Sequence, residues 1–234
     1  MRIALATCNT LPDWEVDDQP LHEALEQRRV RIDRPAWDDF SYDWSAVDAC
    51  LIRTTWDYTT RVDDFIAWAD RIARETLLFN PPDVIRWNVH KTYLRDLEAK
   101  GVPVIPTIWC EPGAGTAGAS LDALADAGWS RAFIKPAVGA TAAGTMRFDV
   151  NELDRPAARR HLDALHAAGQ TALIQPYLDA VETEGEVSAI FIDGRISHGV
   201  RKIPVPGDYR VQDDYGATDE PYEFSEDDRQ LGPV

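Results

Sequence analysis

The chain has 234 residues and a formal net charge of −16 at pH 7. Nucleic acid and anionic membrane surfaces would repel such a chain unless a local basic patch intervened, so we expect small molecules as partners, with no nucleic acid and no membrane. Hydrophobic residues make up 44% of the sequence, which excludes a disordered chain and is typical of one or two folded domains.

Two further features of the sequence indicate the compartment. The N-terminal apolar run is too short for a secretory signal, and no segment reaches transmembrane length. Three widely spaced cysteines, Cys8, Cys50 and Cys110, fit buried thiols under reducing conditions. Together these features predict a cytoplasmic protein.

The first eighty residues alternate between strand and helix patterns. Apolar runs predict strands over residues 2–7, 30–32, 48–53 and 77–80, and helical spacing predicts helices over 21–28 and 62–76. This order predicts a small parallel sheet whose ligands bind beyond the carboxyl ends of its strands. Arg53 and Asp57 would lie at that rim, either as substrate contacts or as an ion pair that braces a turn beside core residues Trp56 and Tyr58.

The pair Pro81-Pro82 predicts a boundary between a first domain, residues 1–82, and a second, residues 83–234. The second begins with an amphipathic helix that Gly101 ends and that carries Lys91 in its first turn. A cation there opposes the helix dipole. Lys91 is therefore interpreted either as an ordinary surface residue or as a ligand of an anion near the helix start.

The later elements follow from the same patterns. The sequence predicts an edge strand over 102–108, a helix capped by Ser120 that runs to 127, strands over 133–135 and 173–178, a helix over 161–168, and a hairpin of strands 187–192 and 196–200 around the turn at 193–194. Ser225 is interpreted as the N-cap of a further helix with acidic first-turn residues.

The stretch from residue 132 to 145 carries the strongest chemical signal. A short apolar run ends at Lys135, proline follows, and the next residues are small. Such a loop leaves backbone N–H groups uncovered, and the lysine supplies a compact point charge, so phosphate is the expected occupant. The order differs from the Walker pattern, in which glycines precede the lysine. The alternative is an ordinary surface hairpin.

Six short motifs occur in order along the chain. They are Ile-Arg-Thr-Thr-Trp-Asp-Tyr at 52–58, Trp-Asn-Val-His-Lys-Thr-Tyr-Leu at 87–94, Phe-Ile-Lys-Pro at 133–136, Gln-Pro-Tyr-Leu at 175–178, Gly-Glu-Val-Ser at 185–188 and Gly-Asp-Tyr-Arg at 207–210. Each is weak singly, but their order and spacing resemble the ATP-grasp superfamily. Within it, the chain is most similar to the prokaryotic glutathione-synthetase-like ligases, which include a ligase of cycloserine biosynthesis.

The resemblance implies a fold of the α/β and α+β classes. A small Rossmann-like N-terminal (pre-ATP-grasp) substrate domain would precede an ATP-grasp domain of two α+β subdomains. The lid subdomain would cover about residues 103–175, and the C-terminal strands of the family would be missing.

The resemblance also implies the roles of the nucleotide-binding residues. Lys91 and Lys135 would hold the α- and β-phosphates of ATP. A loop containing Gly139, Thr141, Gly144 and Thr145 would cover the β- and γ-phosphates. Gln175, Tyr177 and Leu178 would line the adenine slot, and Glu186 would accept the ribose hydroxyls.

The reaction that the resemblance implies is ATP-dependent ligation of a carboxylate and an amine, both amino-acid-like, through an acyl phosphate. The product would be an amide or a ring, with release of ADP and phosphate. Arg210 is the first candidate for contacting the transferred phosphoryl group, and Arg201 is the second. Lys202 ranks lower, since cations here could instead pair with Asp208, Asp213 or Asp214. A homo-oligomer is left open.

The sequence departs from the family in one respect. The family places its Mg²⁺ ligands, an acidic residue and a Glu-x-Asn pair, on late strands that do not follow here. We therefore assign no metal ligand and interpret the chain as a truncated enzyme; the alternative is a non-catalytic nucleotide-binding or interaction module. Asp213 and Asp214 are weak substitutes as metal ligands. A nicotinamide-dependent enzyme is disfavoured because residues 7–10 lack the glycine fingerprint.

Overall fold

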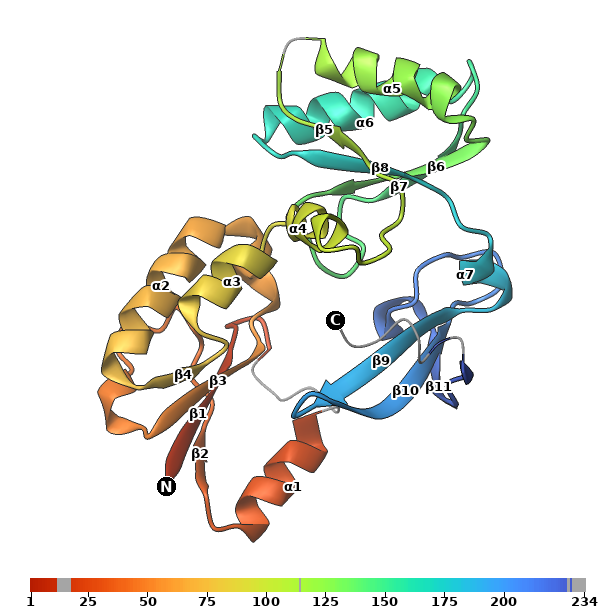
Figure 1. Cartoon of the computed structure of the whole chain (residues 1–234). Coiled ribbons are helices and arrows are strands. Elements are labelled where there is room, and N and C mark those ends of the chain that lie inside the picture. The colour runs from red at the N-terminus through yellow and green to blue at the C-terminus, as the bar shows by residue number, and fades with distance from the viewer. Residues whose placement is uncertain (12–17, 114, 227, 229–234) are drawn as a thin grey trace. The chain divides into compact units, whose positions relative to one another are not determined.

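The computed structural model describes residues 1–11, 18–113, 115–226 and 228. The chain divides into two compact units, an N-terminal unit of residues 1–94 and a C-terminal unit of residues 95–234 (Figure 1). Each unit has its own sheets and helices.

The N-terminal unit is built on a parallel sheet, as predicted. Its strands are β1 (Arg2–Thr7), β2 (Arg31–Asp33), β3 (Ala49–Thr54) and β4 (Leu77–Phe79), in the order β2-β1-β3-β4. Strand β1 is apolar at nearly every position because both of its faces are buried.

Helices cover both faces of this sheet. Ile3 and Leu5 of β1 lie in one apolar cluster, against which Leu21 and Leu25 of α1 (Gln19–Gln27) pack. Alternate residues point to the opposite face, where the cluster contains buried side chains of α2 (Val62–Glu75) and α3 (Pro82–Asn88). The result is a three-layer α/β arrangement.

Aromatic side chains fill the core on the α2 face. Trp37 contacts Phe65 edge-on at 5.3 Å between ring centroids, and Phe65 stacks on Trp68 at 5.2 Å. The short 3₁₀ helix η2 (Trp44–Ala46) adds the fully buried Trp44. A second one, η3 (Trp56–Thr60), follows β3. Trp56 is 49% exposed, so the expectation that it belongs to the core is wrong, whereas Tyr58 packs against the core.

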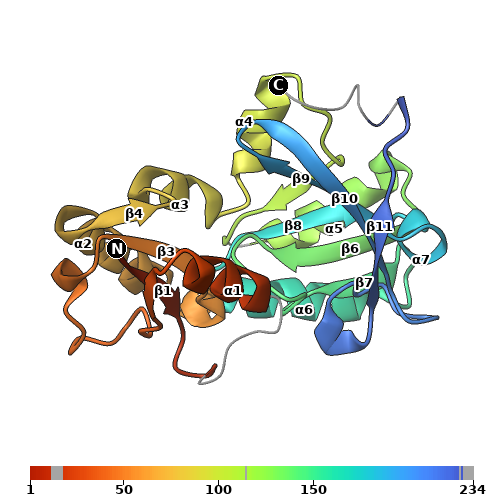
Figure 2. The ribbon, with the colours of Figure 1, turned by 90° about the horizontal axis from the view of Figure 1, so that it is seen from below.

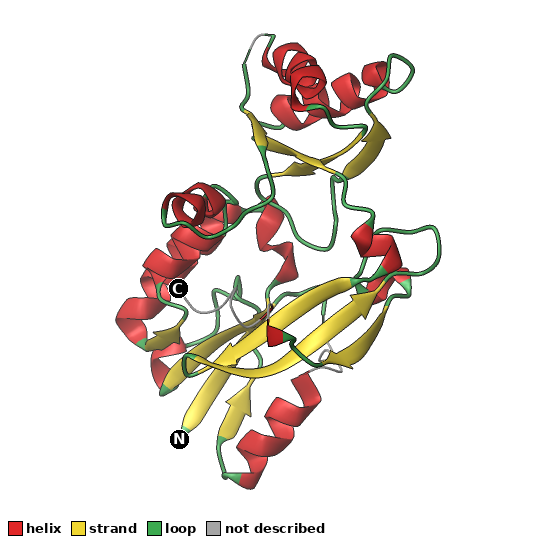
Figure 3. Cartoon of the chain, turned by 45° about the vertical axis from the view of Figure 1, so that its right-hand side comes forward, coloured by secondary structure: helices red, strands yellow, loops and turns green. Residues whose placement is uncertain are grey.

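The C-terminal unit contains an antiparallel sheet covered by two helices. Its strands are β5 (Ile108–Cys110), β6 (Arg131–Pro136), β7 (Met146–Asp149) and β8 (Ala172–Pro176), in the order β5-β8-β6-β7. Helices α5 (Thr116–Ala127) and α6 (Arg155–Ala167) lie on the same side of it (Figure 3). They bury Ala132, Ile134 and Ile174 of the strands.

A three-stranded antiparallel sheet follows the short helix α7 (Ala180–Thr183). It consists of β9 (Glu186–Ile192), β10 (Arg195–Ile203) and β11 (Thr218–Tyr222), which lie side by side in the order β11-β10-β9 (Figure 2). The predicted hairpin turn is confirmed, and both of its residues, Asp193 and Gly194, have positive φ angles of 52° and 71°.

Several predicted boundaries are wrong. Ser120 is not an N-cap, because α5 begins four residues earlier and buries this serine. Residues 102–107 are not a strand, although β5 does lie at the sheet edge as predicted. Helix α4 (Tyr93–Ala99) begins after Lys91, so this lysine lies in the turn before the helix and not in its first turn.

The positions of the cysteines and the role of Ser225 agree with the predictions from the sequence. All three cysteines are buried, and burial raises the pKa of the Cys50 thiol to about 12. Ser225 caps as predicted: Asp228 N–H donates to its hydroxyl at 3.2 Å, while Ser225 N–H donates to the Asp228 carboxylate at 2.8 Å. In the described part of the chain, we find no helix with the length and apolar character to cross a membrane.

Candidate functional site

The face of the β5–β8 sheet that points away from α5 and α6 carries the predicted phosphate-binding lysine. Lys135 pairs with Leu173 across β6 and β8, and Phe133 pairs with Gln175, so these four residues share a face. Arg147 of β7 pairs with Phe133 and joins them. Burial of the alternate residues in the core fixes this register, since a shift by one residue would turn Lys135 into the helices.

Lys135 lies close enough to Glu186 for their charges to interact. Burial lowers the pKa of the Lys135 ammonium from its ordinary value of 10.5, and the Glu186 carboxylate opposes that shift. The structure therefore brings together the residue predicted to bind phosphate and the residue predicted to bind ribose. They stand on different sheets, 51 positions apart in the sequence.

A glycine fixes the backbone just before Glu186. Gly185 has a φ angle of +87°, and a Cβ atom there would lie 2.6 Å from the carbonyl oxygen of Lys202. Only glycine fits both restrictions, so β9 can start against β10 directly at Glu186.

The β9–β10 register separates two of the candidate cations. Lys202 pairs with Glu186 and shares its face of the sheet. Arg201 pairs with Val187 on the other face, where its guanidinium lies 4.9 Å from the centroid of the Tyr222 ring. Lys202, which ranked below Arg201 in the sequence, is therefore the cation on the side of Glu186.

The small-residue loop after β6 is held by two tyrosines that the sequence did not single out. Its turn places Thr141 and Ala142 at φ angles of 49° and 56°, which are unusual for residues with a side chain. The Tyr215 hydroxyl donates to the Thr141 carbonyl at 3.1 Å, and the Tyr209 hydroxyl lies 3.3 Å from the Thr145 hydroxyl. The segment that carries Arg210 is thereby linked to the loop.

Arg210 itself is oriented by its neighbours. Its Nε donates to Asp208 Oδ1 at 2.9 Å, and its guanidinium lies 3.8 Å from the centroid of the Tyr215 ring. This ion pair raises the pKa of Arg210 and holds that of Asp208 well below its usual range. The anticipated pairing with Asp208 is thus present, whereas Asp213 and Asp214 lie in the exposed 3₁₀ helix η4 (Asp213–Tyr215).

The residues predicted for the adenine slot occupy the end of β8 and the residues after it. Gln175 is buried, and its side-chain amide donates to the Thr107 hydroxyl at 2.8 Å. Over the Tyr177 ring lie two guanidinium groups, Arg131 at 4.8 Å and Arg147 at 5.0 Å from the centroid. Leu178 is 44% exposed. Leu178 and the backbone of this segment are therefore more accessible to a base than the Tyr177 ring.

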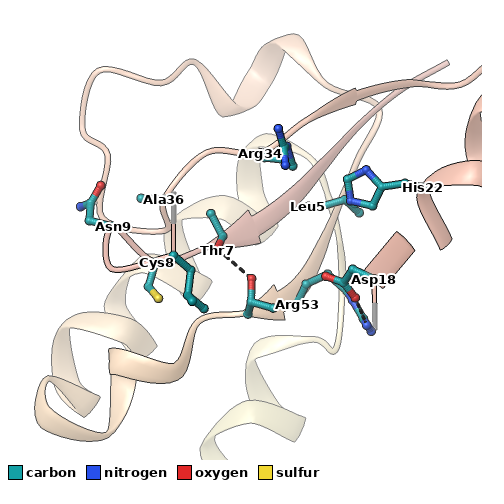
Figure 4. A pocket seen from close by; sticks show the side chains of 11 residues that line it. Leu5, Thr7, Cys8, Asn9, Asp18, His22, Arg34, Ala36 and Arg53 are labelled. Carbon is teal, nitrogen blue, oxygen red and sulfur yellow. Dashed lines mark hydrogen bonds and ion pairs between the residues drawn. The ribbon is translucent and has the colours of Figure 1, made fainter. Parts of the chain in front are cut away.

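Arg53 and Asp57 do not form the ion pair that was one of the two interpretations of the sequence. Arg53 pairs with Asp18 and not with Asp57, and both members of the pair line a cavity of this unit (Figure 4). Asp57 instead pairs with Arg61 at 2.8 Å and accepts a hydrogen bond from the Trp37 indole at 2.7 Å. The sequence could not predict the partner of Arg53, because Asp18 lies 35 positions earlier, whereas Arg61 lies only four residues after Asp57. Lys91 belongs to this unit and Lys135 to the other, so their joint contact with one nucleotide stays a prediction.

Metal-ligating side chains do not cluster in the part of the chain that is described. Within it, no group of three or more His, Cys, Asp or Glu side chains lies close enough to hold a metal ion.

The fold and the similarities to known proteins identify the chain as an ATP-grasp ligase, the class that the sequence predicted, in which ATP drives formation of a C–N bond. A family model described as the N-terminal domain of D-cycloserine synthetase DcsG matches residues 3–80. The cycloserine biosynthesis protein DcsG of Streptomyces lavendulae is 35% identical over 201 residues, which cover 86% of this chain and 67% of that protein. The chain belongs to the DcsG family.

Solved structures agree with this assignment. The crystal structure of D-cycloserine synthetase DcsG superposes with a TM-score of 0.86 at 30% identity, covering 99% of this chain and 78% of that one. D-alanyl-alanine synthetase A from Vibrio cholerae superposes with a TM-score of 0.68 at 14% identity, covering 99% and 77%. At that identity the second likeness shows the fold alone.

Proposed function

We propose that this ligase activates the carboxylate of a small amino-acid-like substrate as an acyl phosphate and joins it to an amine, giving an amide or a ring with release of ADP and phosphate. The observation that carries the proposal is the proximity of Lys135 and Glu186 at the ends of two sheets. One is a partly buried cation suited to a phosphate, and the other is a carboxylate suited to two adjacent hydroxyl donors. The similarity to the cycloserine biosynthesis protein DcsG supports the substrate class.

The other residues have roles in the same proposal. The loop containing Gly139, Thr141, Gly144 and Thr145 would cover the β- and γ-phosphates, with Lys91 as a second phosphate ligand. Gln175, Leu178 and the backbone around Tyr177 would form the adenine slot. Arg210 would contact the transferred phosphoryl group, with Lys202 and Arg201 as further candidates.

In this reaction the protein positions groups and stabilises charge. The substrate carboxylate attacks the γ-phosphorus of ATP, ADP leaves, and the amine then attacks the acyl carbon and displaces phosphate. Negative charge develops on the phosphoryl oxygens, so fixed cations such as Lys135 and Arg210 stabilise the transition state. Covering the site with the loop would exclude water, which would otherwise hydrolyse the acyl phosphate.

Magnesium is typical of such ligases, in which it would offset the negative charge of the phosphates. The alternative that the sequence left open, a module that binds nucleotide without turning it over, is the second candidate function.

The test is ADP release by the full chain, supplied with ATP, magnesium and small amino acids one at a time. We expect release that depends on the amino acid and that the substitution Arg210→Ala suppresses while ATP binding persists. ATP binding without ADP release would favour the second function. Failure to bind ATP would contradict both.

A further inference from the structure

The segment of residues 207–216 packs on the face of the β5–β8 sheet that carries Lys135. The Tyr209 ring meets the Phe133 ring edge-on at 5.0 Å between centroids, and Phe133 shares the face of Lys135. The Arg147 guanidinium, from the same face, lies 5.4 Å from the centroid of the Tyr209 ring. Arg210 therefore follows directly after a residue that is anchored on this face.

The backbone of Tyr215 is fixed by the turn in which it lies. Val211, shortly before it, is buried. Within η4 the Tyr215 N–H donates to the Gln212 carbonyl at 2.9 Å. Gly216 ends the turn with a φ angle of +80°, a conformation that favours glycine, and its N–H donates to the Asp213 carbonyl at 2.8 Å. The tyrosine side chain thus starts from a defined position.

The Tyr215 ring holds the flat face of the Arg210 guanidinium, whose carbon lies 3.8 Å from the ring centroid. The Asp208 carboxylate holds a different part of the same group, since its two oxygens accept hydrogen bonds from Arg210 Nε at 2.9 and 3.1 Å. A guanidinium is planar. The carboxylate fixes one edge of that plane, and the ring fixes the direction in which the plane faces.

The hydroxyl of the same tyrosine holds the small-residue loop of residues 139–145. Tyr215 donates to the Thr141 carbonyl at 3.1 Å, at the start of the two residues with positive φ angles, Thr141 and Ala142. Inside the loop, Ala143 N–H donates to the Ala140 carbonyl at 3.0 Å, which maintains the turn itself. The bond from Tyr215 differs in that it ties this turn to another segment.

From these two contacts we propose that Tyr215 is a positioning residue that couples the covering of the phosphates by the loop to the orientation of Arg210. Its hydroxyl holds the loop and its ring holds the guanidinium, so one side chain serves both. This inference rests on the proposed ligase function and deepens it. Arg210 would be oriented for phosphoryl transfer only while the loop covers the site, so the acyl phosphate would form where water is excluded.

Two substitutions separate the two contacts in a kinetic experiment with the full chain, ATP, magnesium and an amino acid that supports ADP release. Tyr215→Phe removes the hydroxyl and keeps the ring, and we expect it to raise the KM for ATP by about fivefold while kcat stays within about twofold of the wild type. Tyr215→Leu removes both contacts and should also lower kcat by at least about tenfold.

The matched control is Tyr222→Phe in β11. This change also removes a bonded hydroxyl, which donates to Asp228 at 2.9 Å, and it also keeps a ring beside a guanidinium, that of Arg201 at 4.9 Å. Both KM and kcat should be unchanged in this control. Circular dichroism would verify that each variant is folded.

Arg210→Ala shows whether the ring acts through the arginine. In that background Tyr215→Leu should lower kcat no further, because the group that the ring positions is already absent. The effect of Tyr215→Phe on KM should persist there, since it acts through the loop. A merely structural role of Tyr215 would lower kcat by the same factor in both backgrounds.

Nuclear magnetic resonance measures the position of Arg210 without turnover. The Nε–H of Arg210, assigned by its disappearance in Arg210→Lys, should show an upfield ring-current shift because the guanidinium lies against the Tyr215 ring. That shift should remain in Tyr215→Phe and be lost in Tyr215→Leu.

Three results would overturn the inference: equal kcat values for the two Tyr215 variants, an equal fall of kcat in both backgrounds, or the same Arg210 resonance in the wild type and Tyr215→Leu. ADP release that depends on Arg210, with an unchanged resonance in Tyr215→Leu, refutes this inference alone. ATP binding without ADP release by the wild type refutes the proposed function, and the resonance then decides whether Tyr215 positions Arg210.

Discussion

Two roles are open to the Glu186 carboxylate. It can accept hydrogen bonds from the ribose hydroxyls of ATP, or it can only stabilise the positive charge of Lys135. Glu186→Gln should weaken ATP binding by roughly tenfold, because an amide accepts the two ribose hydroxyl hydrogen bonds less strongly than a carboxylate does. For 2′,3′-dideoxy-ATP, which lacks both hydroxyls, the variant and the wild type should have similar affinity. Calorimetry of both nucleotides measures the difference.

The control is Glu184→Gln, a neighbouring exposed residue at the end of α7. An equal loss for both nucleotides on Glu186→Gln would assign Glu186 to the support of Lys135 and remove its ribose role.

The sequence singles out Lys135 by its place at a strand end before small residues, and it singles out Glu186 only through the resemblance to a family. The roles of both residues stay predictions. Their supporting partners were not predictable. Tyr215 contacts Thr141 across 74 positions, and Asp18 pairs with Arg53 across 35, so only the tertiary fold brings them together.

Strand β9 can begin at Glu186 because the residue before it, Gly185, is a glycine. Gly185→Ala would place a Cβ atom 2.6 Å from a backbone carbonyl oxygen at a φ angle of +87°. Gly194→Ala, in the β9–β10 turn, meets open space at a φ angle of +71°. Both changes incur the left-handed penalty of about 1–2 kcal/mol, but only the first adds a clash.

Urea unfolding should therefore show a larger loss of stability for Gly185→Ala than for Gly194→Ala, by about 1 kcal/mol or more. The first variant should also weaken ATP binding, because the strand that carries Glu186 would shift. Equal losses of stability in the two variants would contradict this prediction. They would show that a side chain at position 185 meets no clash with β10 that lowers the stability.

Most elements were predictable from their hydrophobic period, and the failures have physical reasons. Strand β11, Thr-Asp-Glu-Pro-Tyr, has almost no apolar residues, because it is largely exposed. Strand β7 is only four residues long. The start of α5 was misplaced because Ser120 has the chemistry of a cap, while tertiary packing buries it within the helix.

At the scale of the whole molecule, an acidic chain binds a polyanion only where a cation is placed locally. Burial lowers the pKa of Lys135, so this lysine loses its charge at a lower pH than an ordinary lysine does. ATP affinity should accordingly be retained at neutral pH and fall as the pH rises through that lowered pKa.

Arginine keeps its charge throughout this range, so the decline with pH should be shallower in Lys135→Arg than in the wild type. Calorimetric titration with ATP at a series of pH values measures both profiles. Parallel profiles for the two proteins would assign the decline to another group.

The most direct test of the account is the affinity of the full chain for ATP when the Lys135 charge is removed. Lys135→Met keeps the length of the side chain, and Lys100→Met makes the same change at an exposed site after α4. Calorimetry should show ATP binding at least about tenfold weaker for Lys135→Met and unchanged for Lys100→Met. Wild-type affinity in Lys135→Met would contradict the assignment of this face of the β5–β8 sheet to the nucleotide.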